Sequence, residues 1–287
     1  MANDFDNTAL NATVRELWDD KVEDARYAEG VIMNAVANKS EIAKKKGDII
    51  HVTIDQKYTV GNVASDGSFT PQNYTPTTSD VTLNIWEQIA IRVLDRAEAQ
   101  SFWTPESKFP TNVGKAMANS YDSKLAANHS SVAAGNISGS TVTPAEFDLT
   151  LARESLLRLA NTNVPLDELT WVLHPVSYWN GLMSEAQLTS AADGGSAQNL
   201  NKSGKINQLL NFPVKTSTNI VQTGTPAVYK NLLLHKASMA IAWQKDAQIE
   251  RVRAVPALIF ADVFAAQSLY GQSVIRSDHF VVINTKA

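Results

Sequence analysis

Two runs of alternating apolar and polar residues, 48–54 and 81–86, enclose a long polar segment. The period of two predicts a pair of β-strands. The segment between them, 55–80, is rich in Thr, Ser, Asn, Gly and Pro, and a structureless loop of that length is unusual inside a compact domain. A two-stranded hairpin is only marginally stable alone. We therefore expect an extended hairpin that another molecule holds in place, which favours assembly over catalysis.

The few large apolar residues of this hairpin cannot form a core, because they are scattered along it. They are Tyr58, Phe69 and Tyr74. Together with Trp18, near the N-terminus, they are the residues that we predict to contact neighbouring molecules. The return strand is expected to continue through 89–93, where the alternation goes on.

The composition is that of a folded protein rather than a disordered one. The chain has 287 residues, of which 44% are hydrophobic and 19% charged, enough for one large domain or two smaller ones. It has no cysteine, so disulfides and thiolate metal sites are excluded. The first residues do not form a signal peptide, and no apolar run is long enough for a membrane helix. We expect a soluble protein that makes no membrane contact and stays in the cell that produces it.

The charge argues against a protein that reads nucleic-acid sequence. The net charge is −4, whereas such proteins usually carry a basic excess. The single basic cluster consists of Lys39, Lys44, Lys45 and Lys46. It is typical of a solvated helix end, and the alternative is weak phosphate contact without sequence preference.

Three helices are expected in the first part of the chain. Residues 10–38 have apolar residues at helical spacing, and the lysines before Gly47 suit the end of that helix. A second helix is predicted over 111–129. Its narrow apolar stripe, which suits packing across a sheet, consists of Val113, Met117, Tyr121 and Leu125.

The third helix is predicted to begin at a capping box. Thr143 would be the N-cap, Pro144 the first helical residue and Glu146 the reciprocal partner. Strands follow in irregular alternation with short helices, so the predicted class is α+β. The expected strands are 169–173, 228–234, 249–255, 257–264 and 280–283.

No motif for catalysis, a metal or a cofactor is present. The sequence Ser203-Gly204-Lys205 fails as a phosphate-binding loop, because Asn199 and Ile206 occupy positions that need Gly and Ser or Thr. No Gly-x-Ser-x-Gly elbow occurs. A metal site from scattered histidines stays open, although none has metal-motif spacing to another. These histidines are His51, His129, His174, His235 and His279.

The order of the pieces resembles the major capsid protein of tailed bacteriophages, the fold of the Hong Kong 97 type. The similar motifs are Tyr121 to Leu125, Trp171 to Pro175, Leu209 to Val214, Leu233 to Ala237 and Tyr270 to Val274. They are degenerate, but their order spans nearly the whole chain. The resemblance implies an N-terminal arm, an extended β-hairpin loop, a peripheral domain with a long spine helix, and an axial domain.

The resemblance also implies domain boundaries. The N-terminal arm would be 1–45 and the extended loop 46–95. The peripheral domain would be 96–145, with its spine helix at 108–130. The axial domain would be 146–245, and the late strands 246–287 would return to the peripheral domain.

The function implied is structural. The chain would assemble with itself into pentamers and hexamers of an icosahedral head around double-stranded DNA, in the bacterial cytoplasm and then the virion. A separate scaffolding protein, a portal, a decoration protein and weakly bound DNA would be its partners, with no cofactor and no catalysis. The alternatives are an encapsulin-like compartment, a tail tube or sheath protein, and an enzyme or ligand-binding domain with an unrecognised site.

Overall fold

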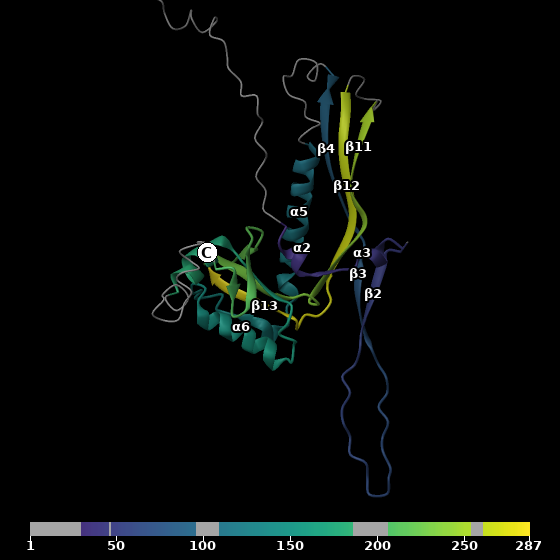
Figure 1. The fold of residues 1–287 in the computed structure, drawn as a ribbon, viewed down its shortest axis with the longest axis vertical. Helices are drawn as coiled ribbons and strands as arrows, with labels where there is room; N and C mark the ends of the chain where they lie inside the picture. The colour runs from purple at the N-terminus through teal and green to yellow at the C-terminus, as the bar shows by residue number, and fades with distance from the viewer. Residues whose placement is uncertain (1–29, 46, 96–108, 186–205, 254–260) are drawn as a thin grey trace, which may run out of the picture.

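The computed structural model describes residues 30–45, 47–95, 109–185, 206–253 and 261–287. Three parts can be followed in Figure 1. A compact unit is formed by α6 and a seven-stranded sheet, and an elongated unit by α5 and three long strands. A thin hairpin, which we call the arm (49–82), points away from the free end of the long strands. The mixture of helices and strands agrees with the predicted α+β class.

The elongated unit is a four-stranded sheet covered by one helix. The strand order is β1-β11-β12-β4. The strands are β1 (Ala37–Asn38), β4 (Ile85–Leu94), β11 (Met239–Arg253) and β12 (Ala261–Val274). The covering helix is α5 (Phe109–Ala127), followed by the 3-10 turn η2 (Asn128–Ser131).

The prediction of a long helix with a narrow apolar stripe is confirmed. All four stripe residues are buried, and α5 packs along β12 through aromatic pairs. Phe109 lies 6.0 Å from Phe264 and Tyr121 lies 4.6 Å from Tyr270, measured between ring centroids. The stripe is narrow because the helix buries only the side that faces the sheet.

The compact unit has its sheet between two apolar layers. The strand order is β5-β13-β10-β6-β8-β7, with β9 paired to β10. One face packs with α6 around Trp171, and the other packs toward α5 through Leu232 and Phe280. The strands are β5 (Ile137–Ser138), β6 (Leu169–Leu173), β7 (Gln208–Leu209), β8 (Phe212–Thr216), β9 (Gln222–Thr223), β10 (Val228–His235) and β13 (Phe280–Lys286). The helical pieces are η3 (Ala134–Asn136), α6 (Leu149–Asn161), η4 (Ser177–Gly181) and η5 (Leu182–Ser184).

The predicted start of the third helix is wrong. Helix α6 begins at Leu149 and its N-cap is Asp148, whose carboxylate accepts from the Leu151 N–H at 2.7 Å. Thr143 is exposed and bonds to Ser140 instead. A capping box needs helical residues directly behind it, and here the chain is irregular until Leu149 is buried.

The predicted helix over 10–38 is wrong in the part that the structure describes, residues 30–38. That part holds only α2 (Ile32–Ala35), because the next residues pair in parallel with β11 as β1. The lysine run follows a separate short helix, α3 (Ser40–Ala43). Trp18 and the rest of the predicted helix lie outside the described residues.

A buried carboxylate on α5 fixes the start of α2. The Asp122 carboxylate accepts from the N–H groups of Val31, Ile32 and Met33, at 2.5, 3.1 and 2.9 Å. Burial raises the pKa of Asp122, although the three N–H groups pull in the opposite direction. The segment that leads from the N-terminal residues is thereby tied to the middle of the long helix.

The predicted return strand is two strands in different sheets. In the arm, β2 (Ile49–Ile54) pairs with β3 (Thr77–Thr82), and β4 then pairs with β12. The alternation of apolar and polar residues continues through β3 and β4, so the sequence pattern does not mark Leu83–Asn84 as the point where the chain changes its partner strand. At the other end of the chain, β13 lies in the compact unit, whereas β11 and β12 lie in the elongated unit. The sequence-based segment 246–287 is therefore shared between the two units.

Candidate assembly surfaces

The arm is held together at its root by a backbone ladder and beyond it by side chains. The ladder runs from Ile49↔Thr82 to Ile54↔Thr77. Further out, Gln56 Nε2 donates to the Asn73 carbonyl at 2.9 Å and the Gln56 Oε1 accepts from Thr75 N–H at 2.6 Å. The Gln72 amide bridges to Thr59 in the same way.

Backbone bonding resumes only at the arm's tip. Of the backbone bonds in the described chain, those beyond the ladder are Ala64 N–H to Ser68, at 3.0 Å, and Gly67 N–H to Ala64. Apart from those that bond the Gln56 and Gln72 amides, the main-chain groups of the legs between ladder and tip have no backbone partner within the described residues. Such groups can pair with an added strand.

The predicted contact residues of the arm are exposed. Tyr58 is 64% exposed, Phe69 73% and Tyr74 62%, and Val60 and Val63 are also exposed. They contribute little to the fold, because each side chain stays largely in water. Trp18, the fourth predicted contact residue, lies outside the described residues.

The arm's root is packed tightly onto the elongated unit. Ile50, Val81 and Leu83 form a small core with Ala240 and Ala242 of β11. A side chain at Gly271 of β12 would collide with the Thr82 carbonyl. The root is therefore fixed in direction, while the legs and tip project freely (Figure 1).

A flat face of the elongated sheet is exposed on the side remote from α5. Alternation along β4 points Ile85, Ile89 and Ile91 toward α5, and Trp86 to the other side, where it is 73% exposed. The strand registers set Gln88, Gln267 and Gln248 side by side on one rung of this face. The next rung carries Ala90, Ala265 and Glu250. We call these two rungs with Trp86 the glutamine face.

β4 is the last strand of its sheet, so its outer edge has no partner strand within the described residues. An unpaired edge beside an exposed, weakly charged face can accept a further strand. The sequence analysis missed this face. The alternation over 85–93 carried the signal, but it was interpreted as part of the hairpin.

A polar cluster under this sheet fixes β4 to the helix. Glu87 accepts from Lys124 at 2.5 Å and from Ser120 at 2.8 Å. Burial opposes the charge of Glu87, but these bonds outweigh it and hold its pKa below the usual value. Burial, and next the charge of Glu87, raises the pKa of Tyr270. This cluster lies on the α5 side of the sheet, away from the glutamine face, and holds β4 against α5.

Within the described residues, no group of three His, Asp or Glu side chains could hold a metal ion. Each histidine has a local role: His51 pairs with Asp80 across the arm at 2.6 Å, and His174 stacks on Tyr229 at 3.8 Å. His235 and His279 face each other. Among the described helices, none is long and apolar enough to span a membrane.

Comparison with solved structures gives matches over the full chain. A chain from Mycobacterium phage Che8 matches with a TM-score of 0.79 and 23% identity, covering 99% of this chain and 98% of that one. The capsid structure of cyanophage P-SCSP1u matches with a TM-score of 0.75 and 13% identity, covering 99% and 96%. The capsid of Ralstonia phage GP4 matches at 0.69 and 12%, covering 95% of each. No protein-family model matches the sequence, and neither does any curated protein.

The fold is therefore that of phage capsid proteins. This confirms the fold expected from the sequence, the tailed-phage capsid fold of the Hong Kong 97 type. The match spans both units and the segments that join them, because it covers nearly the whole of this chain and of each relative.

Proposed function

We propose that this chain is a structural major capsid protein that assembles with itself into pentamers and hexamers of an icosahedral phage head. The observation that carries the proposal is the full-length match to phage capsid chains at TM-scores up to 0.79. The role is mechanical rather than catalytic. The protein would form the shell of the virion after assembly in the host bacterium.

The arm gives the proposal a physical basis. Beyond its packed root, a 34-residue hairpin with exposed legs and exposed aromatic side chains can gain further stability from contact with another molecule. The glutamine face and the open edge of β4 on a neighbouring copy offer both main-chain groups and apolar surface. A head-to-tail contact of this kind closes into a ring when the rotation per subunit is right.

The arm contact also explains how weak interactions can hold a shell. Every subunit gives one arm and receives another, so a ring closes through several contacts at once, and the shell is multivalent. The arm bears few charges, with Lys57 its only Lys or Arg and Asp55, Asp66 and Asp80 its acids. Its contact therefore depends little on salt, in contrast to a contact made by ion pairs.

The remaining partners are part of the same proposal. Double-stranded DNA would be enclosed with weak and non-specific contact, which suits a chain of net charge −4. A separate scaffolding protein, a portal and a decoration protein would complete the head. The domain names follow from this proposal: the compact unit would be mostly axial and the elongated unit mostly peripheral.

The test is deletion of residues 57–78, the legs and tip of the arm, followed by electron microscopy of the purified protein. The intact chain is expected to form closed shells. The deletion variant is expected to remain folded and soluble without forming shells, because only exposed residues are removed.

A matched control removes exposed apolar surface elsewhere. Val142→Ser with Leu157→Ser changes two exposed side chains outside the arm and should leave shells intact. Normal shells from the deletion variant would overturn the role of the arm. Tubes or monomers from the intact chain would overturn the capsid proposal itself.

A further inference from the structure

Two short connecting segments lie side by side between the compact and the elongated unit. One runs from the end of β10 at His235 to the start of β11 at Met239, and the other from Val274 to Phe280. We call these two segments the crossover. His235 N–H donates to the His279 carbonyl at 3.1 Å, and the N–H groups of Ile275 and Arg276 donate to the Ser238 carbonyl at 2.9 and 3.0 Å.

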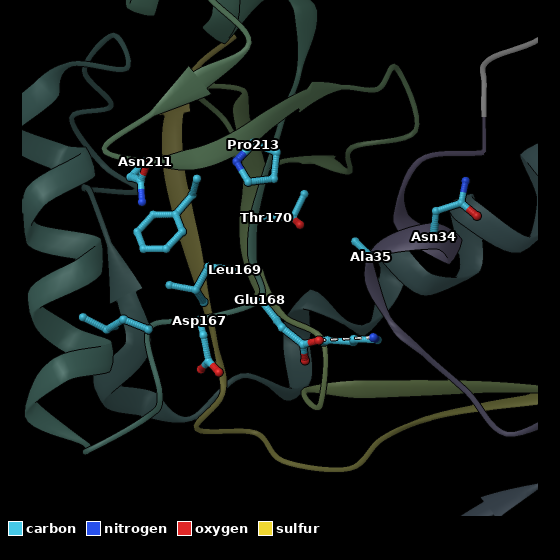
Figure 2. Close-up of a pocket in the computed structure, with 11 residues that line it drawn as sticks. Asn34, Ala35, Asp167, Glu168, Leu169, Thr170, Asn211 and Pro213 are labelled. Atoms are coloured by element: carbon cyan, nitrogen blue, oxygen red, sulfur yellow. Dashed lines mark hydrogen bonds and ion pairs between the residues drawn. The ribbon is translucent and has the colours of Figure 1, made fainter.

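A groove of about 540 Å³ lies beside the crossover. Figure 2 shows Asn34 and Ala35 of α2 on one side, and the segment from Asp167 to Thr170 with Asn211 and Pro213 on the other. Lys236 of the crossover pairs with Glu168 across 3.3 Å. The two segments that join the units therefore lie at the edge of the apolar cluster that the units share.

The histidine in the first segment is held in its neutral form by geometry. Nδ1 of His235 accepts from the Ala237 N–H at 3.1 Å, so this nitrogen cannot carry a proton of its own. The proton of the neutral ring then lies on Nε2, which is 3.9 Å from the Asp167 carboxylate. Protonation at Nδ1 would remove this acceptor. It would also place the new Nδ1–H opposite the Ala237 N–H, so that two donors would face each other.

A second histidine and charged groups of both signs surround His235. Its ring lies 5.5 Å from that of His279, centroid to centroid, and both histidines are largely buried. Arg276 is a positive neighbour, while the exposed carboxylates of Asp167 and Glu168 attract a proton. Asp278 bonds His279 at 2.8 Å, and Lys236 offsets Glu168. Burial, followed by the charge of His279, lowers the pKa of His235.

We propose that the crossover is an acid-sensitive joint, in which protonation of His235 breaks its bond to Ala237 and loosens the two connecting segments between the units. The apolar contact of Leu232 and Phe280 with the α5 cluster remains, so the units slide a little instead of separating. The groove beside α2 then changes width.

The direction of the pH effect follows from linkage. A histidine in an opened crossover has its ordinary pKa of about 6.5, whereas the closed crossover lowers it. The closed form is therefore fully favoured above that ordinary pKa. It loses stability as the pH falls below about 6.5. The joint concerns the chain itself and does not depend on the proposed shell.

The test is hydrogen exchange of the full chain at pH 7.5 and pH 5.5, with intrinsic exchange rates divided out. Protection of the amides at 236–239 and 275–279 is expected to fall by up to about tenfold for each pKa unit by which the closed form lowers the pKa of His235. Protection in β10 at Leu232 and Leu233 should remain, which shows that the sheet is intact. Equal protection of the crossover at both pH values would overturn the proposal.

His235→Gln separates protonation from packing, because the glutamine Oε1 can still accept from Ala237 but does not titrate. It is expected to remove the loss of crossover protection at low pH. His174→Gln is the matched control: His174 Nδ1 also accepts from an N–H two residues on, at 3.2 Å from Val176, but lies off the crossover. The loss of crossover protection at low pH should persist in His174→Gln. The joint would be contradicted if His174→Gln showed no such loss, or if His235→Gln still showed it.

A second variant covers the case in which His235→Gln does not fold. His279→Gln keeps the bond from Ala237 to His235 and removes the charge of His279 that lowers the pKa of His235. The loss of protection should then begin near the same pH but be smaller, because the pKa of His235 in the closed form moves closer to its ordinary value. An unchanged pH profile in His279→Gln would argue against the coupling of the two rings.

The groove gives an independent measurement. The chain has no cysteine, so spin labels can be attached at Asn34→Cys and Leu166→Cys, on opposite sides of the groove. The distance between the labels is expected to shift between pH 7.5 and pH 5.5. It should stay fixed when His235→Gln is added. A distance that does not change with pH in the otherwise intact chain would exclude the sliding motion.

Discussion

The arm and the compact unit are both built from strands, but they are stabilised in opposite ways. The compact unit buries Trp171, Leu233 and Val281 completely. The arm leaves Tyr58, Phe69 and Tyr74 mostly in water and joins its legs through the side-chain amides of Gln56 and Gln72. The compact unit is stabilised by apolar burial within its own chain, whereas the arm leaves its apolar surface available to a partner.

Because of this difference, substitutions can change the stability of the subunit and its assembly separately. Burial of a large apolar side chain contributes about 1.5–3 kcal/mol, which is available to the compact unit but not to an isolated arm. Substitutions in the compact unit should therefore change the free energy of unfolding. Substitutions in the arm should change contacts between copies.

The largest effect is expected from Trp171→Ala. The side chain is fully buried, and its Nε1 donates to the Leu209 carbonyl at 3.1 Å. Its loss should lower the free energy of unfolding by about 4 kcal/mol, measured by denaturant titration. Trp179→Ala is the control, because that ring is half exposed, and it should cost about 1 kcal/mol or less. Equal costs for both would contradict the assigned core.

Asp122→Ala should have the next largest effect. It leaves three N–H groups at the start of α2 without their acceptor, at a cost of about 3 kcal/mol. Asp66→Ala removes a carboxylate from the exposed tip of the arm, where it bonds Ser68, and should leave the free energy of unfolding nearly unchanged. Thermal unfolding of the two variants compares a buried with an exposed carboxylate directly.

Gly271→Ala addresses the junction between the two kinds of region. The added methyl group would meet the Thr82 carbonyl, and the root of the arm would have to move. We expect a loss of about 1–3 kcal/mol and faster proteolysis of the arm. Gly114→Ala, on α5 with open space around it, should instead stabilise by up to about 1 kcal/mol. A Gly271→Ala protein as stable as the parent would mean that the root is not packed as described.

The smallest effect on stability is expected from Tyr58→Ser, Phe69→Ser and Tyr74→Ser together. Since all three side chains are exposed, the free energy of unfolding of the subunit should change by less than about 0.5 kcal/mol. Assembly, followed by light scattering, should be strongly weakened. A variant that assembles normally would show that the arm binds through its backbone alone.

Local patterns in the sequence predicted those elements whose stability comes from one buried face. The stripe on α5 and the strands β6 and β10 were expected within a few residues of their bounds. The same patterns gave wrong predictions where contacts between residues distant in the sequence decide the local structure. Thr143 has the residues of a cap, but α6 begins at Leu149 with Asp148 as its N-cap, directly after Phe147 is buried against Trp171.

Of the candidate assembly surfaces, likewise, one was predicted from local sequence and one was not. The exposed aromatics of the arm were predicted because the residues around them are polar and offer no core. The glutamine face was not predicted, because Gln88, Gln248 and Gln267 are far apart in the sequence and meet only through strand registers. The histidines of the crossover were seen one by one, but nothing local indicated that His235 and His279 face each other.

The sequence by itself determined that the chain has a long polar hairpin without a core, a narrow-striped helix and an α+β mixture, because each depends on residues close together in the chain. Only the tertiary structure decided which sheet each strand joins, where the chain changes its partner strand between β3 and β4, and where two histidines meet. Those features depend on contacts between residues distant in the chain, such as the pairing of β4 with β12 and the meeting of His235 and His279, and the free energy of such contacts is not encoded in any local pattern.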